Sequence, residues 1–266
     1  MTDPVYAPEP HGVASAGRRL ADRLLHLLLP APCLGCGAAL PARRSALGLC
    51  APCRARLAPA PADACAVCAR PLAAWALPED YRCGACRRRP PGFDRLLALW
   101  SYRPPLDAVV QALKFGRLDY LGGHLAAELA AGLGDRLSGF DRVVPVPLHW
   151  RRHLSRGYNQ AERIARPLAG LLGIPCLPAL SRRRATPPQS LLGREERLAN
   201  LRRAFRAPRP AQVRGLRLLL VDDVATTGAT LDAAASALKK AGAAAVTAVV
   251  AGRTPLAPMR GDREED

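Results

Sequence analysis

LLLVDDVATTGATL, from Leu218 to Leu231, is the stretch that decides the fold class of this chain. Its four leading apolar residues are typical of a central strand that is covered on both faces. The pattern from Thr230 to Ala241 predicts a helix, which Gly242 ends. The loop between strand and helix then directs backbone amides and the positive end of a helix dipole at an anion.

The polar residues of this stretch suit a ribose 5-phosphate. Asp222 and Asp223 are placed to accept hydrogen bonds from the two ribose hydroxyls, directly or through Mg2+. The phosphate is expected at the loop, whose residues are Ala225, Thr226, Thr227, Gly228, Ala229 and Thr230. These supply hydroxyl donors and a glycine that tolerates positive φ. VDDVATTGAT resembles the phosphoribosyl pyrophosphate (PRPP) signature of type I phosphoribosyltransferases, while the alternative is an ordinary turn capped by threonine.

Eight of the nine cysteines form four CxxC pairs, which have metal-ligand spacing. They are Cys33, Cys36, Cys50, Cys53, Cys65, Cys68, Cys83 and Cys86. Two intervening residues present both sulfurs to one tetrahedral ion, and two such pairs complete a four-thiolate zinc site. The spacing therefore predicts two structural Zn2+ ions. Sequential pairing into two zinc ribbons and a crossed arrangement both fit it.

Residues 31–92 are rich in Ala, Pro and Arg and poor in large apolar side chains, so we expect metal to stabilise them. A structural zinc site contributes on the order of 10 kcal/mol to folding such a module. A disulfide framework and a redox dithiol are the alternatives. We see no export signal, which disfavours the first, and the fourfold repetition of the motif disfavours the second.

The composition is strongly basic, with a formal net charge of +17 from 39 basic and 22 acidic residues. Such a surface favours polyanions, either nucleic acid or phosphorylated metabolites, although a merely solvated arginine-rich surface has the same composition. No apolar run reaches the roughly 18 to 20 residues that span a bilayer. We therefore expect a cytoplasmic protein in which residues 1–30 carry an amphipathic helix and residues 255–266 form a disordered charged tail.

Strand and helix patterns alternate after the Pro90-Pro-Gly92 boundary. We expect strands at residues 95–102 and 141–147 and helices at 106–113, 120–133 and 159–172. The predicted fold for residues 93–254 is an α/β domain, with a mostly parallel sheet and helices on both faces, preceded by a small double zinc-ribbon module at 31–92. Ligands of such sheets bind beyond the C-terminal ends of the strands.

Further motifs accompany the four knuckles: LKFG at residues 113–116, PVPLHWRRHLSRGYNQAERIA at 145–165 and TPPQ at 186–189. In this combination the chain resembles the ComF family, which has a double zinc ribbon and a type I phosphoribosyltransferase-like domain. The resemblance implies binding of PRPP with Mg2+. It also implies a link to natural competence and DNA uptake, with single-stranded DNA and competence proteins as possible partners.

Several residues are candidates for contacts to the pyrophosphate or for a mobile lid. They are Lys114, Arg151, Arg152, Arg156, Asn159, Gln160 and Gln189. The two adjacent arginines have the forked donors that pyrophosphate favours. Residues 181–189 occupy the place where such transferases carry a mobile lid, although a solvated basic run is the alternative for their arginines. Asn159 also fits a helix cap, and Lys114 also fits a helix C-terminal cation.

Two classes of function follow. The first is a phosphoribosyltransferase, or at least a PRPP-binding protein, that acts on an unknown acceptor, and it requires the Asp222–Asp223 pair. The second is a non-catalytic factor that uses zinc ribbons and a basic surface to associate with single-stranded DNA. Salt-sensitive DNA binding distinguishes the second class from the first.

Overall fold

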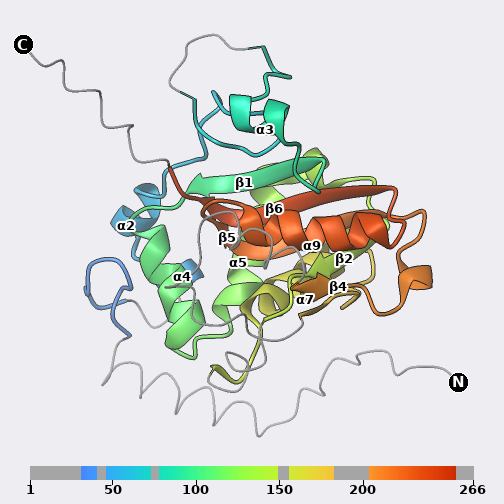
Figure 1. Ribbon diagram of the computed structural model, residues 1–266. Helices are drawn as coiled ribbons and strands as arrows, with labels where there is room; N and C mark the ends of the chain where they lie inside the picture. The colour runs from blue at the N-terminus through green and yellow to red at the C-terminus, as the bar shows by residue number, and fades with distance from the viewer. Residues whose placement is uncertain (1–30, 41–45, 73–77, 149–155, 183–203, 256–266) are drawn as a thin grey trace, which may run out of the picture.

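The computed structural model describes residues 31–40, 46–72, 78–148, 156–182 and 204–255 (Figure 1). A parallel four-stranded sheet forms its centre, in the order β1–β6–β5–β2. The strands are β1 (Arg95–Ser101), β2 (Arg142–Pro145), β5 (Arg217–Ala225) and β6 (Ala245–Arg253). The expected parallel sheet is confirmed, and the strand that contains the aspartates is one of its two interior strands.

Helices cover both faces of the sheet, as expected. One face carries α4 (Leu106–Phe115), α5 (Leu121–Leu133) and α7 (Gln160–Leu172), and α9 (Ala229–Lys240) crosses the other (Figure 1). The alternation of side chains along β5 explains this arrangement, because successive residues of a strand point to opposite faces. Leu219 and Val221 pack with α5 and α7, whereas Leu218 and Leu220 pack with α9.

Strand β5 is longer than its apolar run, since it continues through both aspartates to Ala225. Pairing with β6 on one side extends along its length, with Asp222 opposite Val250. The chain then turns through three residues, and α9 begins after Gly228, which has a φ of 81°. The sheet therefore holds the two carboxylates on a rigid strand, and a helix N-terminus follows directly.

The shorter elements surround this core. They are η1 (Ala46–Gly48), α2 (Ala51–Ala55), α3 (Gly84–Arg88), η2 (Gly134–Leu137), β3 (Ser181–Arg182), β4 (Phe205–Arg206) and η4 (Pro210–Gln212). Strands β3 and β4 pair antiparallel, with Arg182 opposite Phe205. In Figure 1 α2 lies beside α4, and α3 lies beyond the edge strand β1. The cysteine-rich part thus contacts the sheet domain beside α4 and along β1, where Pro59 forms an antiparallel bridge with Trp100.

Several expectations fall outside the described residues: the amphipathic helix at 1–30, residues 256–266 of the tail, and Arg151, Arg152 and Gln189. Among the helices that the structure does describe, none combines the length and the apolar character needed to cross a bilayer.

Candidate functional site

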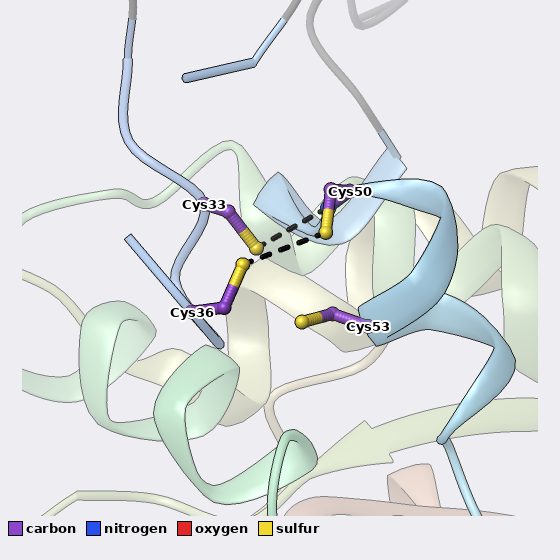
Figure 2. Close-up of side chains that lie close together, drawn as sticks. All are labelled: Cys33, Cys36, Cys50 and Cys53. Carbon is purple, nitrogen blue, oxygen red and sulfur yellow. Dashed lines mark hydrogen bonds between the residues drawn. The ribbon is translucent and has the colours of Figure 1, made fainter. Parts of the chain in front are cut away.

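The first four cysteines converge on one point. Figure 2 shows the thiols of Cys33, Cys36, Cys50 and Cys53 turned toward one another, and their sulfurs all lie within 4.8 Å of each other. The backbone amide of Cys50 donates to Cys33 Sγ at 3.2 Å. Burial opposes ionisation of Cys33, but backbone amides that donate to its sulfur lower the pKa of the thiol to about 6. The cluster is therefore prepared to hold a thiolate.

The other four cysteines form a second cluster of the same kind: Cys65, Cys68, Cys83 and Cys86. The backbone amide of Cys83 donates to Cys65 Sγ at 3.3 Å, as its counterpart does in the first cluster. Burial again opposes ionisation, and backbone amides again prevail, so the pKa of Cys65 falls to about 7. The pairing of the four knuckles is sequential, which settles the alternative that the spacing left open.

Both clusters fit Zn2+ by their dimensions. Four sulfurs at about 2.3 Å from a tetrahedral zinc ion are separated from one another by about 3.8 Å. The sulfurs of Cys36 and Cys50 are 3.7 Å apart, and those of Cys68 and Cys83 are 3.9 Å apart. Four thiols per cluster are also the donor set of structural zinc sites. The chain therefore has two four-cysteine sites of zinc-ribbon type.

The aspartate pair lies at the C-terminal edge of the sheet. Asp223 is 3% exposed, and its Oδ1 forms an ion pair with Lys114 Nζ at 3.1 Å. Its Oδ2 is buried and has no hydrogen-bond partner among the described residues. A buried carboxylate oxygen without a partner costs free energy, unless a ligand or an ion completes its contacts.

Asp222 has a strongly shifted pKa. Burial and the adjacent charge of Asp223 raise the pKa of Asp222 to about 7, although the backbone amide of Asp223, which donates to Asp222 Oδ1, and the charges of Lys114 and Arg182 oppose the shift. An unfolded chain, with an ordinary value of 3.8, loses this proton at lower pH than the folded chain does. The folded state thus binds more protons between about pH 4 and 7, and its stability falls as pH rises through that window.

The predicted phosphate loop surrounds the N-terminus of α9. Thr226 and Thr227 are exposed, whereas Ala225 is buried as the last residue of β5. The left-handed conformation of Gly228 turns the chain into the helix, where residues Ala229 and Thr230 form the first turn. Thr227 Oγ1 accepts from the amide of Ala229 at 3.3 Å. Hydroxyls, backbone amides and a positive helix end are therefore available to one anion.

Three other candidates lie after β2, near the end of α4. Asn159 caps α7: its Oδ1 accepts from the amide of Ala161 at 3.2 Å, and its Nδ2 donates to the carbonyl of Val146 at 3.0 Å. Arg156 lies 4.7 Å from the ring centroid of Phe115 and donates to Gln160 Oε1 at 3.2 Å. Asn159 thus has a local structural role as the cap of α7. Lys114 is more than a cation at the end of α4, because it also forms the ion pair with Asp223.

Sequence reasoning missed Arg253, the last residue of β6. It is a buried arginine that contacts both the start of the phosphate loop and the second cysteine cluster. Nothing in its neighbourhood along the chain marks it, since an arginine after an apolar strand usually begins a solvated loop. Arg182 of β3, whose charge lowers the pKa of Asp222, lies in the run for which the sequence predicts either a lid or a solvated basic segment.

Comparison with known families agrees with this geometry. A double zinc ribbon domain model matches residues 24–87, and a phosphoribosyl transferase domain model matches residues 154–260. These two matches define the molecule as a double zinc ribbon followed by a phosphoribosyltransferase-like domain. Among solved structures, the B. subtilis glutamine PRPP amidotransferase is 24% identical. The match covers 50% of this chain and 26% of the amidotransferase chain, with a TM-score of 0.35.

Relatives extend over most of the chain. The DNA utilization protein YhgH of Salmonella typhimurium is 38% identical over 228 residues, which cover 83% of this chain and 96% of that protein. Competence protein F of Haemophilus influenzae is 32% identical over 202 residues, which cover 73% of this chain and 86% of that protein. The chain belongs to the ComF family.

Proposed function

We propose that this protein binds PRPP, or another ribose 5-phosphate, together with Mg2+, at the C-terminal edge of its sheet. The observation that carries the proposal is the buried carboxylate of Asp223, which has one oxygen on Lys114 and the other without a partner among the described residues. The phosphate loop and the N-terminus of α9 follow within a few residues of it.

Different residues bind different parts of the ligand. Asp222 and Asp223 accept hydrogen bonds from the ribose hydroxyls, and their oxygens are the ligands that Mg2+ prefers. The amides and hydroxyls from Thr226 to Thr230 hold the 5-phosphate. Lys114 places a positive charge beside the pair, with its Nζ 3.1 Å from Asp223 Oδ1. When bound, Mg2+ supplies charge that neutralises the pyrophosphate.

We further propose that the bound PRPP reacts with an acceptor. The bond from C1′ to the pyrophosphate oxygen breaks, pyrophosphate leaves with the electron pair, and an acceptor nucleophile forms the new bond at C1′. This chemistry needs positive charge near the departing group rather than a protein nucleophile. Arg151 and Arg152, which lie outside the described residues, are the proposed donors to the pyrophosphate.

Calorimetry tests the binding site directly. We expect Mg-PRPP to bind the zinc-loaded full-length protein, and the Asp222→Ala/Asp223→Ala variant to lose at least about 100-fold in affinity, since it loses both carboxylates. Asp135→Ala is the matched control, because Asp135 is an exposed acid in η2. Equal affinity of the parent and the double variant refutes the proposed role of the pair.

The pH profile sharpens this experiment. If binding needs the ionised carboxylate of Asp222, affinity rises by about tenfold per pH unit up to the pKa of about 7 and then levels off. PRPP has titrating phosphates of its own, so the profile is compared with that of Asp222→Asn. We expect the variant to lose the part of the pH dependence that Asp222 contributes, and an identical profile contradicts it.

A second candidate function is association with DNA. It is favoured by the names of the relatives, which refer to DNA utilization and competence, and by the net charge of +17. We expect a labelled single-stranded oligonucleotide to bind with an affinity that falls linearly with salt on a logarithmic scale. Lack of salt-sensitive binding by folded, zinc-loaded protein removes this candidate without affecting the first.

A further inference from the structure

Arg253 is a buried cation at the end of β6. Arg253 is only 3% exposed, and no carboxylate of the described residues forms an ion pair with it. Burial lowers the pKa of its guanidinium, as expected for a cation that has lost most of its water. A buried charge of this kind persists only where other polar groups replace that water.

Backbone carbonyls take the place of water around Arg253. Its Nη1 donates to the carbonyls of Ala225, at 3.0 Å, and of Thr226. Its Nε donates to the carbonyl of Cys68 at 3.2 Å. One planar fork therefore joins the first residues of the phosphate loop to a cysteine of the second metal site.

Neighbouring hydrogen bonds make this junction stiff. The amide of Thr254 donates to the carbonyl of Ala225 at 3.0 Å, and the carbonyl of Val67 accepts from the amide of Leu96 in β1 at 2.8 Å. The knuckle is thus held on the sheet on one side and on Arg253 on the other. The first cysteine site has no comparable bond to the loop among the described residues.

We propose that Arg253 is a positioning residue through which zinc in the second four-cysteine site orders the phosphate loop and raises its affinity for a ribose 5-phosphate. Zinc fixes Cys68, the carbonyl of Cys68 fixes the guanidinium, and the guanidinium fixes the carbonyls of Ala225 and Thr226. The amides that follow in the loop then face the phosphate without further rearrangement. The effect on affinity rests on the proposed function, whereas the effect on the loop does not.

Hydrogen exchange of the ligand-free, full-length protein tests the link to the loop. We expect Arg253→Met to increase exchange of amides 226–230 by at least about tenfold while the protein remains folded and retains two zinc ions per chain. Arg217→Met is the matched control, because Arg217 lies at the other end of the adjacent strand and packs its guanidinium 6.0 Å from the ring centroid of Phe140. Unchanged exchange in Arg253→Met overturns the proposal.

Two further variants test whether the fork of Arg253 and the second metal site act on the loop through one path. Arg253→Lys keeps the charge but lacks the fork, so we expect intermediate exchange, and it serves in place of Arg253→Met if that variant does not fold. Cys86→Ser removes a ligand of the second site without touching Cys68 and should raise exchange in the same amides. Adding Arg253→Met to Cys86→Ser should raise it little further, because both act on one path. Fully additive effects contradict a shared path.

Affinity is measured last, with Mg-PRPP as the probe. We expect Arg253→Met and Cys86→Ser each to weaken binding by about tenfold, and Arg217→Met to leave it unchanged. If the parent does not bind Mg-PRPP, the proposed function fails, yet the exchange data still decide whether the loop is linked to the metal site. If the parent binds and both variants bind equally well, the link to affinity is refuted.

Discussion

The two cysteine sites repeat one design but are joined to the sheet domain differently. In each, the amide four residues after the first cysteine donates to its carbonyl, at 2.8 Å from Gly37 and 2.9 Å from Ala69, and a short helix follows the third cysteine. The first site shares the hydrophobic core of α4 and α5, whereas Cys65, Cys83 and Cys86 form a small cluster of their own. A common metal fold therefore serves as part of a core in one place and as an attached module in the other.

Corresponding positions of the two repeats hold different residues, which explains this difference. Leu49, before the third cysteine of the first site, is 1% exposed, and its counterpart Arg82 is exposed. Gly35 in the first knuckle corresponds to Val67 in the second. The first repeat thus contributes fully buried leucines and a close backbone approach, while the second contributes backbone carbonyls and only partly buried side chains, such as Val67, to the core that includes α9. The difference predicts that damage to the first site spreads further through the molecule.

Removing one metal ligand from each site should give the largest contrast. Cys53→Ser is expected to unfold the first ribbon and to destabilise α4 and α5 with it, because a structural zinc site contributes on the order of 10 kcal/mol and this one is part of their core. Cys86→Ser should leave the sheet domain folded. Thermal unfolding with proteolytic mapping measures both. Equal resistance of the sheet domain in the two variants contradicts the comparison.

The apolar anchor should give the next largest effect. Leu49→Ala removes a fully buried side chain and should lower the free energy of unfolding by about 2–5 kcal/mol. Arg82→Ala, at the equivalent position, should change it by no more than about 0.5 kcal/mol, since its side chain is exposed. Urea unfolding of the zinc-loaded proteins measures the difference. A loss below about 1 kcal/mol in Leu49→Ala refutes the anchoring role.

The close approach at Gly35 should give a smaller effect. A Cβ there lies 3.0 Å from Cys53 Sγ and 3.0 Å from Pro105 Cβ, so Gly35→Ala should cost about 1–3 kcal/mol. A Cβ at Gly84 in α3 meets first the mobile end of Arg88, at 3.3 Å, and the added methyl group should stabilise the helix by about 0.4–1 kcal/mol. The two alanine variants are thus expected to shift the unfolding midpoint in opposite directions, and shifts of the same sign contradict the packing difference.

The sequence predicted those features that depend on local patterns. The apolar run before Asp222, the glycine turn and the CxxC spacing each specify a short structure, and the strand, the turn and both metal clusters follow them. The sharing of a core by the first ribbon was not predicted, because the few leucines of residues 31–92 become a core only with α4 and α5. Arg253 was missed for the same reason, since all of its partners are distant in the chain.

A surface contact should give the smallest effect and the finest test. Arg54 forms an ion pair with Glu128 of α5, whereas its counterpart Arg87 lies 5.8 Å from the ring centroid of Tyr81 within its own ribbon. Half-exposed contacts of this kind contribute about 0.2–1 kcal/mol. A double-mutant cycle of Arg54→Ala with Glu128→Ala should therefore give a coupling of this size, which salt reduces.

The location of the effect matters more than its size. Because the Arg54 contact joins a ribbon to α5, its loss should lower the unfolding midpoint of the sheet domain, while Arg87→Ala should alter exchange only in the second ribbon. If Arg87→Ala also lowers the midpoint of the sheet domain, the second ribbon stabilises the domain through more than its hydrogen bonds and the partial packing of Val67. The first ribbon is then no longer the only one that acts as part of the core.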